Sequence, residues 1–106
     1  MKRVQRKRTK GWKMSKNTKY VGRPTKWGNP FLVEDLGAEK AVKRYKECIL
    51  NNAMCYYYFD EIEASIQFYR FKWIAENLGQ LRGLDLTCFC SLSSPCHADV
   101  LLELPK

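Results

Sequence analysis

The segment from Cys88 to Asp99 contains three cysteines, Cys88, Cys90 and Cys96, and the single histidine of the chain, His97. Three thiolates and one imidazole are a ligand set that Zn²⁺ takes in closed tetrahedral sites. The spacing is unusual, because common zinc sites use pairs of cysteines separated by a few residues, whereas Cys96 and His97 are adjacent. One interpretation is therefore a zinc site with all four ligands, or with three of them and without Cys88.

Two other interpretations of the same segment stay open. A helix that begins at Cys96 would lower the pKa of its thiol through the partial positive charge of the helix N-terminus, with His97 as an adjacent base. Cys96, His97 and Asp99 are then candidate catalytic groups. Alternatively, Cys88 is a small core residue, Cys90 a free thiol and His97 an ordinary hydrogen-bonding residue. A zinc deaminase is excluded, because its His-x-Glu and Pro-Cys-x-x-Cys signatures do not occur.

A strand and a helix must position these residues. An apolar strand over 84–90 places Cys88 and Cys90 on one face near its end, and its near-continuous hydrophobicity predicts a central position in a sheet. A last helix is expected to begin with Ser94 as N-cap and Pro95 as its first residue, and to end at Pro105. Its expected inward residues are Val100, Leu101 and Leu104. A strand end that leads into a helix N-terminus also suits anions, so metal and ligand sites can coincide.

Two further helices are predicted from apolar periodicity. Residues 38–50 have helical spacing of Ala38, Val42, Tyr45 and Ile49. Residues 61–78 follow an N-cap at Asp60 with Glu63 three positions later, and end at Gly79. The apolar residues Ile62, Ile66, Tyr69 and Trp73 form one stripe of this helix, and Phe71, Ile74 and Leu78 widen it beyond a single face, so we expect the helix to be heavily buried. Residues 51–59 suit a strand, a loop or a helix equally well.

Two short strands, within residues 3–9 and 19–21, are expected to form a hairpin, although residues 3–9 also suit a flexible arm. The order of elements predicts an α/β (or α+β) fold, a single small domain with a short mixed sheet flanked by about three helices. We expect residues 1–18 to be a basic N-terminal arm or edge strand and residues 19–106 to be a single α/β domain.

The net charge of +8 is concentrated in the first third of the chain. Residues 1–30 contain 11 of the 19 Lys and Arg residues and none of the 11 Asp and Glu residues. Such a segment favours phosphate-bearing partners such as a nucleotide or nucleic acid, or else is a solvated arm. No apolar run approaches the length of a membrane span, and the five cysteines do not have the spacing of a disulfide framework. We therefore expect no membrane partner and a cytoplasmic location.

The segment Tyr20–Phe31 combines cations, glycines and aromatic residues. Arg23 and Lys26 suit contacts to phosphate, and Trp27 suits stacking on a base. The alternative is that Trp27 and Phe31 anchor a loop in the core.

Two segments of the chain resemble a family of small domains of unknown function in bacteria and their phages. The family segment Gly-Arg-Pro-x-Lys-Trp-Gly-Asn-Pro-Phe corresponds to residues 22–31. Its second segment, Leu-Arg-Gly-x-Asp-Leu-x-Cys-x-Cys followed by Cys-His-Ala-Asp-Val-Leu-Leu-Glu-Leu, corresponds to residues 81–104. The resemblance extends from Tyr20 onward, and Phe89 stands where family members often have Trp. The basic N-terminal segment then looks particular to this chain.

The resemblance implies one functional surface, which joins the ligand-binding candidates Gly22, Arg23, Lys26, Trp27, Gly28 and Asn29 to the metal and catalytic candidates Cys88, Cys90, Cys96, His97 and Asp99. We expect a small nucleotide- or nucleic-acid-binding domain with a Cys/His zinc site. The alternatives are an enzyme that acts on a nucleotide or modified base through Cys96 and His97, and a phage inhibitor that binds a host protein.

Overall fold

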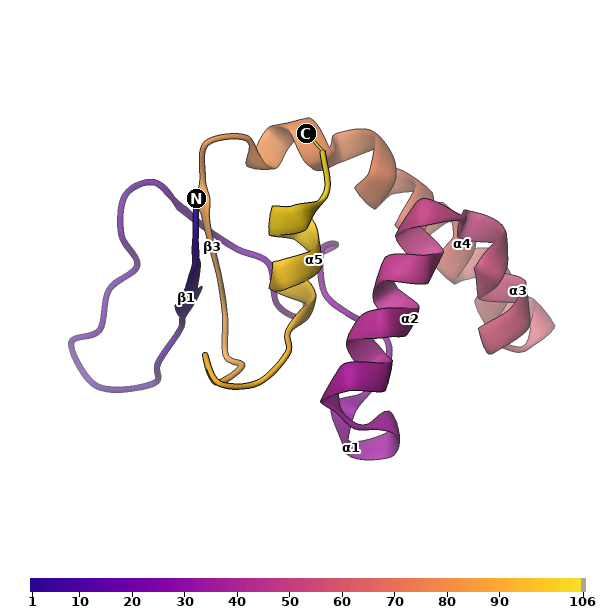
Figure 1. Ribbon diagram of the computed structural model, residues 1–106, viewed down its shortest axis with the longest axis horizontal. Coiled ribbons are helices and arrows are strands. Elements are labelled where there is room, and N and C mark those ends of the chain that lie inside the picture. Colours follow the sequence, from indigo (N-terminus) through magenta and orange to yellow (C-terminus); the bar gives the residue numbers. More distant parts are fainter. Residues whose placement is uncertain (106) are drawn as a thin grey trace.

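Strand β3 (Asp85–Cys88) lies at the centre of a three-stranded sheet in the computed structural model, which describes residues 1–105 (Figure 1). Strand β1 (Arg3–Gln5) pairs with one side of β3 and strand β2 (Thr18–Tyr20) with the other. Both pairs are parallel. The central position predicted for the apolar strand is confirmed, and the residues Leu86, Thr87 and Cys88 are buried in it.

The hairpin predicted for the first two strands is wrong. Strands β1 and β2 do not pair with each other, because β3 lies between them, and the sheet is parallel throughout rather than mixed. The connection over residues 6–17 is rich in exposed lysine and arginine, so it cannot enter the sheet itself. The chain instead crosses from one edge to the other and leaves the centre to the more apolar strand.

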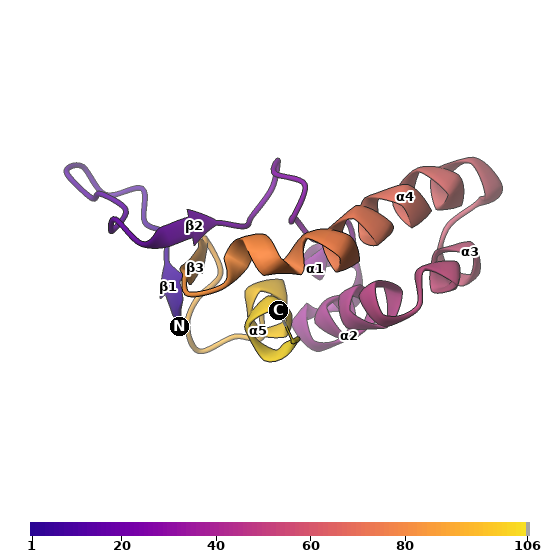
Figure 2. The same cartoon turned by 90° about the horizontal axis from the view of Figure 1, so that it is seen from above.

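Helices α2 (Ala38–Leu50) and α4 (Glu61–Asn77) run alongside each other away from the sheet (Figure 2). They are joined by a 3₁₀ turn over Asn52–Met54 and helix α3 (Cys55–Tyr58). The short helix α1 (Val33–Leu36) precedes α2. Helix α5 (His97–Glu103) lies between the sheet and α2 (Figure 1). The fold is therefore a small α+β domain in which the helices pack on a short sheet.

Helix α4 begins as predicted, since the Asp60 carboxylate accepts a hydrogen bond from the backbone N–H of Glu63. Its buried face was predicted in part, since Phe71 and Ile74 are buried as expected but most of the stripe is not. The stripe of Ile62, Ile66 and Tyr69 is exposed to solvent, at 80%, 57% and 67% of each residue's surface. The buried residues of the helix are Ala64, Gln67, Phe71 and Ile74.

Helix α5 begins two residues later than predicted, with Cys96 rather than Ser94 as its N-cap. The carboxylate of Asp99 accepts a hydrogen bond from the backbone N–H of Cys96, and the Cys96 side chain faces the backbone N–H of Asp99. This reciprocal pair is a capping box with a thiol in the place of the usual hydroxyl. The inward residues Val100, Leu101 and Leu104 are buried as predicted.

One core connects these elements. Its largest fully buried side chains come from α2, α4, the 3₁₀ turn after α4 (Leu78–Leu81), β3, α5 and the segment after β2: Tyr45, Phe71, Ile74, Leu81, Leu86, Leu101 and Val21. Among residues 1–105, no helix combines the length and the apolar composition that crossing a bilayer requires.

Candidate functional site

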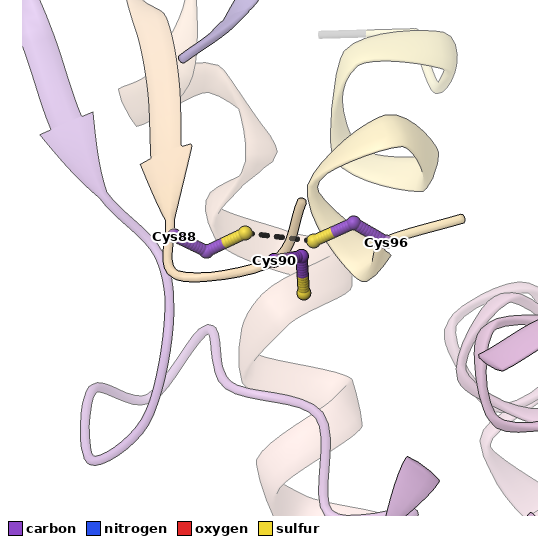
Figure 3. A group of neighbouring side chains, drawn as sticks. All are labelled: Cys88, Cys90 and Cys96. Atoms are coloured by element: carbon purple, nitrogen blue, oxygen red, sulfur yellow. Dashed lines mark hydrogen bonds between the residues drawn. The ribbon is translucent and has the colours of Figure 1, made fainter. Parts of the chain in front are cut away.

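The sulfur atoms of Cys88, Cys90 and Cys96 all lie within 4.8 Å of one another. Cys88 ends strand β3, Cys90 follows in the next turn, and Cys96 precedes helix α5 (Figure 3). Cys88 and Cys96 point toward each other, with their Sγ atoms 2.7 Å apart. The parallel sheet and the capping box of α5 therefore bring together the three thiols that the sequence singled out.

The arrangement fits a metal ion with a preference for thiolates. In tetrahedral zinc sites the Zn–S distance of 2.3 Å sets neighbouring sulfurs about 3.8 Å apart. The upper separation of 4.8 Å and the 2.7 Å between Cys88 and Cys96 lie on either side of that value. Small side-chain rotations are enough to hold an ion among the three sulfurs. All three cysteines are free, so no disulfide competes for them.

The imidazole of His97 lies next to the cysteines and outside the group of three sulfurs. Its Nδ1 is 3.7 Å from Sγ of Cys96, close to the roughly 3.6 Å expected between an N and an S ligand of one zinc ion. Its Nε2 lies 2.7 Å from the backbone carbonyl oxygen of Val21, so Nε2 is the nitrogen that donates. When one ring nitrogen keeps its proton and donates it in a hydrogen bond to a carbonyl, the other nitrogen is free to ligate a metal.

Arg3 is a member of this site that the sequence did not reveal. Its guanidinium is 3.3 Å from a carboxylate oxygen of Asp99, and its Nη2 donates to the backbone carbonyls of Ser91 and Leu92 in the turn between Cys90 and Cys96. Burial opposes the charge of Arg3, but Cys96 and Asp99 raise its pKa overall. A cation at this place would balance negative charge that the cysteine cluster carries when it holds a metal.

The thiols of Cys88 and Cys90 differ in their tendency to ionise. The neighbouring thiols of Cys88 and Cys96, together with the charge of Arg3, hold the pKa of Cys90 well below the usual thiol range. The same interaction with Cys90 raises the pKa of Cys88, and burial adds to it. Cys90 therefore ionises more readily than Cys88.

The candidate catalytic residues are placed less favourably for a nucleophilic mechanism. Cys96 is 1% exposed, and its sulfur contacts Cys88 rather than projecting freely. Asp99 pairs with Arg3 and caps α5, which are structural roles.

The loop from Gly22 to Phe31 is fixed to the helices by hydrogen bonds. Arg70 of α4 donates from Nη2 to the carbonyl oxygens of Thr25 and Gly28, at 3.2 Å and 2.9 Å. The hydroxyl of Tyr45 donates to the carbonyl oxygen of Trp27 at 2.6 Å. The side chain of Asn29 donates to the carbonyl oxygen of Ala41. A loop with so many partners is part of the scaffold of the site.

Gly28 permits a close approach within this loop. A Cβ atom on Gly28 would lie 2.8 Å from Cγ of Arg23 and 3.1 Å from the Arg23 backbone N and Cα. A Cβ atom on Gly22 would lie 2.5 Å from the hydroxyl oxygen of Tyr20, which donates to the carbonyl oxygen of Arg23. The two glycines therefore set the position of Arg23.

A pocket of about 290 Å³ joins the loop to the cysteine site. The predicted site residues in its lining are Gly22, Arg23, Asn29, Cys88, Cys90, Cys96 and His97. Residues not singled out for a ligand also line it, among them Arg8, Tyr20, Phe31 and Phe89. The guanidinium of Arg8 lies 4.1 Å above the Phe89 ring. Within the part of the chain that the structure describes, no residue with a carboxylate side chain lines this pocket.

Trp27 and Lys26 lie elsewhere. Trp27 is 3% exposed and packs edge-on against Trp73 at 4.8 Å, so its ring has no free face for a base and the anchoring alternative describes it. Lys26 extends over the outer face of Trp73, with Nζ 5.0 Å from the ring centre, and lines a different hollow.

Sequence reasoning missed Arg3, Arg8 and Arg70 as members of the site. Arg3 and Arg8 counted only as members of a basic segment, and Arg70 as a polar residue of its helix. The signal for Arg3 was its place next to Val4, a strand former at the start of the chain. Only the register of β1 with β3, which aligns Arg3 with Leu86, places the guanidinium beside Asp99.

A protein family described as "Domain of unknown function (DUF4326)" matches residues 4–106 of the chain. No curated protein and no solved structure matches the chain. The family match begins at residue 4, so the basic N-terminal segment, which looked particular to this chain, falls within the family's domain.

Proposed function

The chain belongs to this family of unknown function, DUF4326, and we propose from its pocket that it is a metal-stabilised domain that binds a nucleotide. The observation that carries the proposal is the 290 Å³ pocket in which two arginines and three aromatic residues surround the cysteine site. This volume is at the lower end of small-ligand pockets, which span about 300–1,000 Å³.

The pocket has a charge that favours phosphate. Neither Arg8 nor Arg23 forms an ion pair with a carboxylate within residues 1–105. A phosphate group would supply the negative partner that these guanidinium groups lack. Guanidinium also forms paired hydrogen bonds with phosphate oxygens. Arg23 is held in place by Gly28 and by the Tyr20 hydroxyl on its carbonyl oxygen, which supports a defined binding geometry.

The aromatic residues of the pocket suit a base. Tyr20 and Phe89 pack edge-to-face with ring centres 5.9 Å apart, and the guanidinium groups of Arg6 and Arg8 lie over these two rings, so a base would stack there in place of a guanidinium group. Phe31 is buried and stacked on Phe59, so it forms only part of the pocket wall. Base-to-aromatic contacts contribute about 1–3 kcal/mol each in single-strand binding sites. The amide of Asn29 is already bonded to the backbones of Ala41 and Phe31, so the proposal gives it a supporting role.

The metal has a structural part in this proposal. Cys88, Cys90 and Cys96 provide three soft ligands and His97 the fourth, a donor set that suits zinc. An ion there would fix the turn between β3 and α5, on which Phe89 and Pro95 contribute to the pocket wall. Loss of the metal is then expected to weaken nucleotide binding indirectly.

Isothermal titration of the metal-loaded protein with the four ribonucleoside 5′-monophosphates tests the proposal, with inorganic phosphate as a separate arm. We expect saturable binding of at least one nucleotide, weakened tenfold or more by Arg23→Gln, in line with the ~1.5–3 kcal/mol of a hydrogen bond to a charged group. Lys43→Gln is the matched control, since it removes the same charge from an exposed position on α2. Equal affinities for the wild-type and Arg23→Gln proteins would contradict the proposal.

A further inference from the structure

A second hollow lies on the other side of the loop that follows β2. It has a volume of about 400 Å³, and its lining consists of Pro24, Thr25 and Lys26 from the loop and Tyr69, Arg70 and Trp73 from α4. Like the first pocket, this hollow has cations and aromatic rings but no carboxylate in its lining.

The two hollows share one short segment of backbone. Gly22 and Arg23 line the first, and the next three residues line the second. Since consecutive Cα atoms are 3.8 Å apart, the change from one hollow to the other takes place within one or two residues. Figure 2 shows this loop rising beside α4, where Arg70 holds it through the carbonyl oxygens of Thr25 and Gly28. The loop is thus a fixed ridge between two hollows of similar chemistry.

The second hollow offers an aromatic surface with a cation next to it. Tyr69 is 67% exposed, although it lies on a helix that buries other aromatic residues. Trp73 is half-buried, with one side against Trp27 and Nζ of Lys26 5.0 Å from its ring centre. An exposed ring such as Tyr69, next to a lysine without a carboxylate partner within residues 1–105, is the combination with which proteins bind single-stranded nucleic acid, where bases stack and cations contact the backbone.

We propose that the ligand of the first pocket is one nucleotide of a single-stranded nucleic acid, whose chain crosses the loop at Arg23 and places the neighbouring base against Tyr69 and Trp73. This inference rests on the proposed function and extends it to the class of ligand. A single strand is required, because a base can enter the 290 Å³ pocket only when it is not stacked within a duplex. The phosphate between the two bases then lies between Arg23 and Lys26, both exposed on the loop.

The basic connection over residues 6–17 gives the strand a path beyond the first pocket. It contains six cations, Arg6, Lys7, Arg8, Lys10, Lys13 and Lys16, and no acidic residue. Arg8 belongs to both this connection and the first pocket. Contacts between such cations and the phosphates of a nucleic acid make the binding affinity fall steeply as the salt concentration rises. The salt dependence of an oligonucleotide should therefore exceed that of a mononucleotide.

Fluorescence anisotropy with 5′-labelled hexanucleotides tests the inference, with each homopolymer sequence supplied as DNA and as RNA, together with duplexes of the same sequences. Isothermal titration with the mononucleotides provides the comparison. We expect the best hexanucleotide to bind at least tenfold more tightly than the corresponding mononucleotide and than the duplex. Tyr69→Ala should weaken hexanucleotide binding by about fivefold to a hundredfold, and Lys26→Gln should weaken it as well, while both variants bind mononucleotide as the wild type does.

Tyr57→Ala is the matched control, because Tyr57 is 79% exposed on α3, away from both hollows, and should leave hexanucleotide affinity unchanged. Quenching of tryptophan fluorescence by hexanucleotide, reduced in Trp73→Phe, provides a second readout at the hollow itself. If mononucleotides bind but the hexanucleotide binds no more tightly, or if Tyr69→Ala has no effect on it, the inference is wrong and the proposed function stands. If neither binds, both fail.

Discussion

Nε2 of His97 lies 2.7 Å from the carbonyl oxygen of Val21, and this hydrogen bond connects the first residue of α5 to the residue directly after β2. Both residues are buried. The contact joins the cysteine site to the loop that bears Arg23, two parts of the molecule that are 76 residues apart in the sequence.

Substitutions of His97 can separate the functions of its two nitrogens. His97→Gln retains a donor near the position of Nε2 but has no counterpart of Nδ1, whereas His97→Asn retains a group near Nδ1 and loses the donor. We expect His97→Gln to lower zinc affinity about 10- to 100-fold with a small change in stability. His97→Asn should lower the free energy of unfolding by about 1–3 kcal/mol, because the buried carbonyl of Val21 is left without its partner. Competition with a zinc chelator and urea unfolding measure the two quantities, and unchanged zinc affinity in His97→Gln would remove His97 from the ligand set.

Each cysteine of the site should be required for metal binding. We expect one zinc ion per chain by elemental analysis of the purified protein, and well below one in Cys88→Ala, Cys90→Ala and Cys96→Ala. Cys48→Ala is the control, because Cys48 is equally buried and lies outside the sulfur group, and burial raises the pKa of its thiol.

Removal of the metal should destabilise the wild-type protein but not a variant that cannot bind it. Because the ion would be bound by the folded chain, a chelator is expected to lower the thermal midpoint of the wild type and of Cys48→Ala. The same chelator should leave the midpoint of Cys90→Ala unchanged. A midpoint that is insensitive to chelator in all of these proteins would show that the three thiols hold no structural metal.

Arg3→Gln should weaken the site without touching a ligand. The substitution removes the ion pair with Asp99 and the hydrogen bonds to the carbonyls of Ser91 and Leu92, which fix the turn between the ligands. We expect zinc affinity to fall about tenfold, within the range that is typical of residues supporting metal ligands. Lys7→Gln is the control, since Lys7 is exposed and its substitution removes an equal charge. Equal losses in both variants would indicate an effect of net charge instead.

Gly28→Ala should displace Arg23. The new Cβ atom would meet backbone atoms of Arg23 at 3.1 Å, which a rotation of side chains cannot relieve. We expect a loss of about 1–3 kcal/mol in the free energy of unfolding together with weaker nucleotide binding. Gly79→Ala is the matched control, because its Cβ atom would meet only a guanidinium nitrogen at 3.9 Å, and stability should be unchanged or slightly higher. Thermal unfolding and titration with nucleotide check both variants.

Local sequence signals predicted the local structure well. The cap at Asp60 and the apolar run of β3 were sufficient to place α4 and the central strand, because each depends on neighbours in the chain. The cluster of Cys88, Cys90 and Cys96 was predicted for a similar reason, since a strand end and a helix start only eight residues apart must lie close together.

Long-range arrangement could not be predicted in the same way. Helix α4 has apolar residues on more than one face, so periodicity alone does not decide which face is buried. The structure buries the face with the small residue Ala64, which permits close packing, and leaves Ile62, Ile66 and Tyr69 in solvent. The pocket could not be predicted for the same reason, because its residues are distant in the sequence. Arg8 reaches the Phe89 ring only because β1 pairs with β3.

The central place of β3 also determines when the sheet can assemble during synthesis. Val4 and Thr87 contact each other across 83 positions of sequence, and Tyr20 aligns with the same threonine. Strands β1 and β2 leave the ribosome early but have no partner until residues 85–88 follow them. Loop closure over such distances slows folding, so the basic first third of the chain remains open to solvent, and to any polyanion nearby, for most of translation.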